Sequence, residues 1–176
     1  MRSLAYFSCI LIALVLLSGL LLGGSWESAA SPPVEQPGER NLAIVVNVNN
    51  TVENLSTPEL RHIFLGERGH WPNGGRRITL VMLEPGQPER TAVLSAIYQM
   101  SESGFNNHFL HGLFTGEVFV SPKTLASPEG VRKFIFNVPG AIGYIRESDV
   151  DKSVKVIRID ERLPSDKGYK FHLPPR

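Results

Sequence analysis

Beyond residue 40, short apolar runs alternate with segments in which apolar residues recur at helical spacing. The first run, LAIVVNV at 42–48, is almost continuously apolar, which is typical of a strand covered on both faces. The same criterion predicts further strands at 78–83, 141–145 and 154–159. Helices are predicted at 56–65, 88–97, 105–113 and 127–135. This order of elements predicts an α/β fold, with a mixed sheet flanked by helices.

The helix after the first strand has the clearest local signals. Ser56 and Glu59 have the spacing of a capping box, in which each residue satisfies a free backbone N–H of the other. Leu55 and Leu60 fit the hydrophobic staple around that box. Gly66 follows the last helical residue, where a left-handed backbone conformation favours glycine. We therefore predict that the helix begins after Ser56 and ends at Gly66.

The first 30 residues have the pattern of an export signal. Arg2 precedes an apolar stretch at 4–22, and small residues follow it. Cleavage after Ala30 would make residues 1–30 a signal peptide. Because the apolar stretch is long enough to approach a membrane span, an uncleaved N-terminal membrane anchor is the alternative. In both cases we expect the rest of the chain to be extracytoplasmic and periplasmic.

Three further segments are predicted after this leader. Residues 31–41 are rich in proline and polar side chains and are interpreted as a tether. Residues 42–160 hold all the predicted strands and helices and are interpreted as one α/β domain. The final segment, 161–176, is predicted to be a C-terminal tail.

Composition argues against several functional classes. The only cysteine, Cys9, lies in the leader, so the domain has neither a disulfide nor a cysteine nucleophile. The net charge of +1 gives no support for nucleic-acid binding. No GxSxG or HExxH motif occurs, and His108 and His111 are interpreted as surface histidines rather than metal ligands. We therefore expect no enzyme activity, no catalytic residue, no metal and no cofactor.

One loop could bind a small anion. It joins the strand at 78–83 to the helix that Pro88 begins, and a helix N-terminus offers free N–H groups and partial positive charge. The tentative ligand-binding residues are Gly86, Gln87, Arg90 and Thr91. The alternative is an ordinary connection in which Glu89 itself satisfies the helix dipole. On the residues alone, that alternative is slightly favoured.

Several stretches resemble the phosphate ABC transporter substrate-binding proteins, a family of periplasmic receptors. They are LSTPELRHIFLGERGHWPNGGRRITLV, ERTAVLSAIY, FNNHFLHGLFTGE and VPGAIGYI. The similarity runs from about Leu42 to Ile145. It implies the type 2 periplasmic binding protein fold, of which this chain would form a single lobe. Phosphate or another small oxyanion is the implied ligand. An ABC importer or a sensor in the membrane is the implied protein partner, and oligomer formation is a further expectation.

The resemblance places the family's second phosphate loop at 83–90. Gly86 matches the family pattern, and Arg90 stands where many members have a basic residue. The serine and threonine donors of the family loop are missing, however, and Glu84 and Glu89 add negative charge. The opening strand and loop of the family's first lobe have no counterpart here. A buried oxyanion needs several donors, so the loop is interpreted as a degenerate anion site.

Three functions remain open at this point. The first is an exported, non-enzymatic module that senses a ligand or binds a partner and has a degenerate anion site. The second is a working phosphate or oxyanion receptor of an ABC importer. The third is a structural or assembly protein that retains only the fold.

Overall fold

The fold was obtained as a computed structural model, which describes residues 40–72 and 75–174 of the 176-residue chain. The predicted leader, 1–30, and the predicted tether up to residue 39 lie outside the described residues. Within the described part, no helix has the length and the apolar character needed to cross a membrane.

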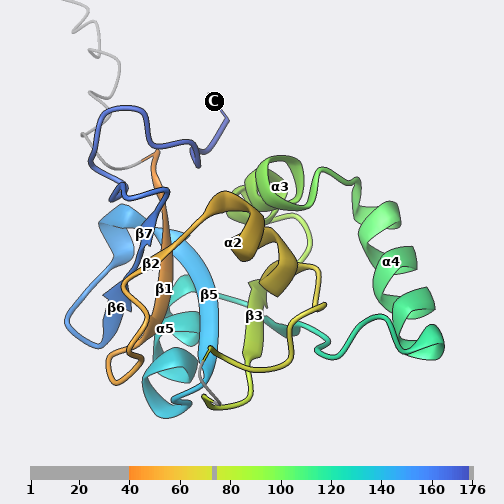
Figure 1. The fold of residues 1–176 in the computed structure, drawn as a ribbon. Helices are drawn as coiled ribbons and strands as arrows, with labels where there is room; N and C mark the ends of the chain where they lie inside the picture. Colours follow the sequence, from red (N-terminus) through yellow and green to blue (C-terminus); the bar gives the residue numbers. More distant parts are fainter. Residues whose placement is uncertain (1–39, 73–74, 175–176) are drawn as a thin grey trace, which may run out of the picture. The chain divides into compact units, whose positions relative to one another are not determined.

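A mixed five-stranded sheet forms the centre of the domain, as predicted (Figure 1). Its strand order is β4-β3-β5-β1-β6, with β3 parallel to β4 and β5, and β1 antiparallel to β5 and β6. A second, two-stranded sheet pairs β2 with β7. The strands are β1 (Leu42–Asn47), β2 (Asn54–Leu55), β3 (Thr79–Leu83), β4 (Lys123–Leu125), β5 (Ala141–Arg146), β6 (Val154–Val156) and β7 (Arg158–Ile159).

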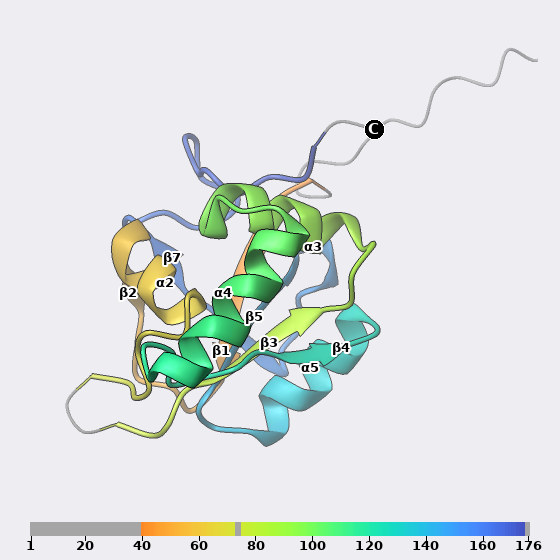
Figure 2. The same ribbon diagram turned by 90° about the vertical axis from the view of Figure 1, so that its right-hand side faces the viewer.

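Helices flank the sheet on both faces, with α2 on one side and α5 on the other (Figure 2). They are α2 (Thr57–Phe64), α3 (Pro88–Val93), α4 (Glu102–Thr115) and α5 (Pro128–Asn137), with the π-helical turn η1 (Leu94–Tyr98) and the 3-10 turn η2 (Glu147–Asp149). Helix α5 packs closely against β5 at Gly143, where an added Cβ would lie 3.3 Å from Ile135 and 3.4 Å from Val131. The next residue of β5, Tyr144, packs instead against Phe64 of α2. Successive residues of β5 point to opposite faces of the sheet, so one strand packs against α5 on one face and α2 on the other.

The predictions for β1 and α2 are confirmed. All six residues of β1 are buried, as expected for a strand covered on both faces. The reciprocal capping box between Ser56 and Glu59 is present. Gly66 has a φ of +76°, and a Cβ there would lie 2.4 Å from the carbonyl oxygen of Val120. This position therefore needs glycine both for its conformation and for the close approach of the chain.

The predicted tail, 161–176, differs from our expectation in its described part. Its apolar residues Tyr169, Phe171 and Leu173 are buried in the core. The backbone N–H of Leu42 donates to the carbonyl of Phe171 at 3.0 Å, and the Tyr169 hydroxyl donates to the carbonyl of Leu42 at 2.8 Å. The domain therefore extends to residue 173, because this segment covers the beginning of β1.

Asp160 connects this C-terminal segment to the beginning of α2. Its carboxylate accepts hydrogen bonds from the backbone N–H and hydroxyl of Thr57, at 2.8 and 2.7 Å, and pairs with Lys170 at 2.9 Å. The hydrogen bond from Lys170 and those from Thr57 lower the pKa of Asp160 from 3.8 to about 2. A carboxylate thus occupies the positive end of the α2 dipole.

This low pKa predicts acid-dependent stability. A depressed pKa in the folded state stabilises the fold above the unfolded-state value near 3.8, and the contribution is lost as pH falls toward 2. We expect Asp160→Asn to be less stable than the wild type at pH 6, with the difference shrinking between pH 4 and pH 2. Thermal unfolding of both proteins across this range measures the difference. A gap that stays constant with pH would contradict the assignment.

Candidate functional site

The predicted anion loop lies at the carboxyl end of β3, where residues 84–87 lead into α3. Gly86 adopts a φ of +91° and is exposed, and Gln87 occupies the N-cap position of α3 without a side-chain cap. The Thr91 hydroxyl donates to the Gln87 carbonyl at 3.3 Å, and the Thr91 backbone N–H donates to the same oxygen at 3.1 Å. These three predicted residues therefore lie close together at the outer side of the turn.

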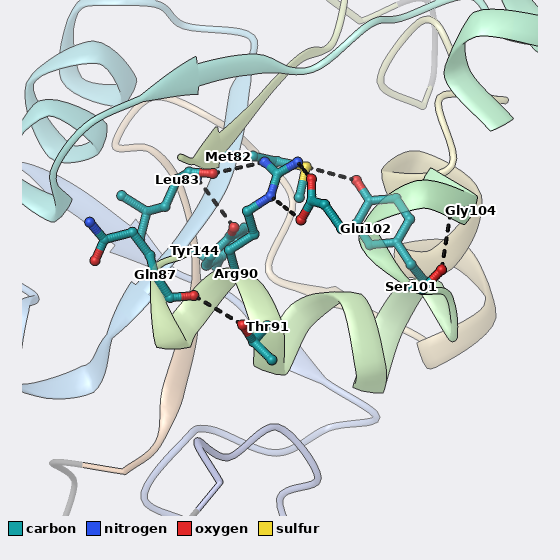
Figure 3. A network of polar contacts seen from close by, with 10 residues as sticks. Met82, Leu83, Gln87, Arg90, Thr91, Ser101, Glu102, Gly104 and Tyr144 are labelled. Atoms are coloured by element: carbon teal, nitrogen blue, oxygen red, sulfur yellow. Dashed lines mark hydrogen bonds and ion pairs between the residues drawn. The ribbon is translucent and has the colours of Figure 1, made fainter. Parts of the chain in front are cut away.

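Arg90, the fourth predicted residue, points into the protein (Figure 3). Its side chain is 4% exposed. Its Nε and Nη2 atoms donate to the two carboxylate oxygens of Glu102, at 3.0 and 2.5 Å, and Nη1 donates to the carbonyl of Leu83 at 2.8 Å. The guanidinium also lies over the ring of Phe105, with 4.8 Å from Cζ to the ring centroid. Arg90 thus joins β3, α3 and α4.

The electrostatics agree with this internal role. Burial disfavours the charge of Arg90, but the hydrogen bond and the charge of Glu102, together with Tyr144 and Tyr98, outweigh burial and raise the pKa of the guanidinium. In turn, the hydrogen bonds from Arg90 lower the pKa of Glu102. A bidentate arginine–carboxylate pair is among the stronger charge-assisted hydrogen bonds in proteins. An anion at the loop would have to compete with Glu102 for the same guanidinium.

The adjacent acidic residue is also held inside the protein. Glu89 is 4% exposed and pairs with Arg146 at the end of β5. Its carboxylate therefore forms an ion pair, and it also lies in the first turn of α3, as expected for a group that satisfies the helix dipole. Neighbouring residues of α3 thus form two ion pairs with different elements.

Two tyrosines complete the buried surroundings of Arg90. The Tyr144 hydroxyl accepts a hydrogen bond from the backbone N–H of Leu83 at 3.2 Å, and the Tyr98 hydroxyl donates to the sulfur of Met82 at 3.2 Å. Burial is the main cause that raises the pKa of both tyrosines. Both hydroxyls therefore stay protonated at neutral pH and act as hydrogen-bonding groups of the core.

Sequence reasoning missed Glu102 and Tyr144. Glu102 begins α4 and Tyr144 lies in β5, so neither is close to the loop in the chain. The only available signal was indirect: an arginine on the buried face of a helix needs a counter-charge.

Among the described residues, no group of three His, Cys, Asp or Glu side chains could hold a metal ion. His108 contacts the carbonyl of Leu65 through its Nε2 atom at 2.9 Å.

A hollow of about 400 Å³ lies at the opposite end of the sheet from the anion loop. It is bordered by residues that follow β1 and precede β3 and β5, among them Asn50, Arg76 and Pro139. Trp71 also borders it, and its indole N–H donates to the carbonyl of Gly140 at 3.1 Å. Trp71 is thus linked to the turn before β5.

No protein-family model matches the chain. Among solved structures, a phosphate ABC transporter substrate-binding protein from Clostridium perfringens, with bound phosphate, aligns with a TM-score of 0.58 at 22% identity. An ABC-type phosphate transport receptor from Vibrio cholerae gives 0.55 at 24% identity, and PstS from Borrelia burgdorferi gives 0.60 at 13%. The alignments cover 71%, 71% and 76% of this chain and 47%, 48% and 55% of the others. The chain therefore shares the fold of phosphate-receptor proteins and spans about half their length.

Proposed function

We propose that the chain is an extracytoplasmic, non-enzymatic binding module with the fold of a phosphate receptor and a degenerate anion site. In this proposal it senses a ligand or binds a partner and does not capture phosphate tightly. The observation that carries the proposal is the buried pairing of Arg90 with Glu102 and the Leu83 carbonyl. The predicted cation of the anion loop already has internal partners.

Besides the backbone N–H groups that begin α3, few donors remain at the loop for tight oxyanion capture. Gly86 offers a backbone N–H, Gln87 an amide and Thr91 a hydroxyl that already donates to Gln87. Glu84 is exposed beside them and repels an anion. Desolvating an oxyanion is costly unless several donors or a cation offset the loss of water. An anion at this loop would therefore remain largely hydrated and weakly bound.

Calorimetric titration of inorganic phosphate and then sulfate into the purified protein tests this proposal. We expect no binding heat up to millimolar concentrations of either anion. Binding in the micromolar range would contradict the proposal. If it were then lost in a correctly folded Arg90→Ala variant, the four predicted residues would be the anion site, and Arg90 would have to exchange partners on binding.

A working phosphate or oxyanion receptor of an ABC importer is the second candidate function. The fold similarity favours it, because one of the aligned structures is described with phosphate bound. Those proteins are about twice as long as the aligned part of this chain. A receptor function would therefore need a second lobe from another molecule, or a site elsewhere in this domain.

A further inference from the structure

The hollow beside Trp71 contains a buried asparagine with an available donor. Asn50 is 9% exposed, its Oδ1 atom accepts from the backbone N–H of Val52 at 2.9 Å, and its backbone carbonyl accepts from Lys155. Within the described residues, its side-chain Nδ2 atom has no hydrogen-bond partner, and this atom reaches solvent. Because Asn50 lines the hollow of about 400 Å³, its amide N–H groups are available to a ligand there.

An arginine lies at the rim of the same hollow. Arg76 is exposed, and in the part of the chain that the structure describes no carboxylate pairs with its guanidinium. Its backbone is fixed, because its carbonyl accepts from the backbone N–H of Trp71 at 3.1 Å. A guanidinium is the donor group best suited to a carboxylate, and an amide N–H adds a second, neutral donor. Arg76 and Asn50 therefore offer a binding site for a carboxylate.

Two carboxylates line the hollow as well. Glu53 pairs with Lys155 at 2.8 Å, and Glu59 accepts from the backbone N–H of Ser56 at 2.9 Å. These hydrogen bonds lower the pKa of both glutamates, so both are charged at neutral pH. A carboxylate can accept further hydrogen bonds, so each could also receive an ammonium group. Both would repel a ligand that carries negative charge alone.

The remaining wall of the hollow is apolar. It is formed by Val52, Leu55, Trp71, Pro72 and Pro139. Small-molecule sites are typically about 300–1,000 Å³ and combine apolar walls with a few placed polar groups. The hollow fits that description. Phosphate and sulfate have neither an apolar part nor a positive group, so they would use little of this surface.

We propose that this hollow binds a small zwitterion of the amino-acid or dipeptide class. The ligand's carboxylate accepts from Arg76 and from the Asn50 amide, its ammonium group donates to Glu53 or Glu59, and its apolar side chain lies against the wall. This inference names the ligand class of the proposed binding module and rests on that proposal. The site is separate from the anion loop, because the two lie at opposite ends of the sheet.

Thermal unfolding of the purified protein with a panel of ligands tests the inference. The panel holds apolar amino acids and dipeptides of apolar residues, each added singly at about 10 mM, and we expect at least one to raise the melting temperature by about 2 °C or more. The amide of that ligand lacks the carboxylate, and its N-acetyl derivative lacks the ammonium group. Neither derivative is expected to change the melting temperature.

Two variants remove the carboxylate-binding groups one at a time. Arg76→Ala removes the cation. Asn50→Asp keeps an oxygen for the backbone N–H of Val52 and replaces the free donor with a repelling carboxylate oxygen. Arg77→Ala is the matched control, because Arg77 is the adjacent exposed arginine and is not among the described residues that line the hollow. We expect the ligand-induced shift to disappear in both test variants and to remain in the control.

The inference is overturned if no member of the panel raises the melting temperature, if the shift persists in Arg76→Ala, or if Arg77→Ala abolishes it equally. Phosphate titration tests the anion loop separately. An inactive panel together with absent phosphate binding would overturn this inference alone. Micromolar phosphate binding that is lost in Arg90→Ala and kept in Arg76→Ala would instead contradict the proposed degenerate anion site and leave the hollow as a second site.

Discussion

Replacing Phe64 with alanine is expected to lower the free energy of unfolding by about 3–5 kcal/mol. Phe64 lies in the last turn of α2 and is fully buried. Its ring centroid is 5.9 Å from that of Tyr98 and 6.3 Å from that of Tyr144. The substitution would remove the apolar contact between α2, η1 and β5 and leave a cavity that rigid neighbours can fill only in part.

Urea denaturation, followed by circular dichroism, measures this loss. Phe136→Ala on α5 is the matched control, because Phe136 is exposed and the same atoms are removed. The control is expected to change the unfolding free energy by less than ~1 kcal/mol. If both variants lost the same amount of stability, α2 would not be packed on the sheet through Phe64 as described.

The elements that could be predicted from the sequence are those with local causes. Strand β1 follows from five consecutive apolar residues, Leu42 to Val46, and α2 follows from Ser56, Glu59 and Gly66, which act on their own backbone neighbourhood. The helix predicted from Pro88 was also found, but its second half is the π-helical turn η1. A π-helical turn depends on tertiary packing, and the residue pattern shows no sign of it.

Elements that depend on distant partners were predicted less well. The proline-rich end of the chain was the ground for predicting a tail, and the alternating apolar residues at 169–173 were not used. Residues 169–173 are held by β1, more than 120 residues earlier in the chain, through the hydrogen bonds that Leu42 makes with Phe171 and Tyr169. The predicted strand at 154–159 is divided between two sheets, because β6 pairs with β1 and β7 pairs with β2.

The same distinction applies to the candidate site. The proximity of Gly86, Gln87 and Thr91 follows from their positions in one turn. The direction of Arg90 does not, because Glu102 and the Leu83 carbonyl determine where its guanidinium lies. The anion-binding role of the four residues remains a prediction, and the internal pairing of Arg90 is what sequence reasoning could not supply.

Removing the cation that faces Glu89 should have the other large effect on stability. Glu89 is buried and Arg146 is its partner, so Arg146→Met would leave a buried carboxylate without a counter-charge. Breaking a buried ion pair in this way typically costs about 3–5 kcal/mol, and we expect a loss of that size in urea denaturation at pH 7. The long apolar side chain of methionine keeps most of the volume of the arginine stem, so lost packing contributes little.

The double variant Glu89→Met/Arg146→Met separates the charge effect from the packing effect. Replacing both members of a buried pair with apolar residues is often neutral, so the double variant should be more stable than Arg146→Met alone. If the double variant were instead as unstable as Arg146→Met, the ion pair would not explain the loss. The recovery would also bear on the anion loop, because a fold that tolerates Glu89→Met has no structural need for this carboxylate at the beginning of α3.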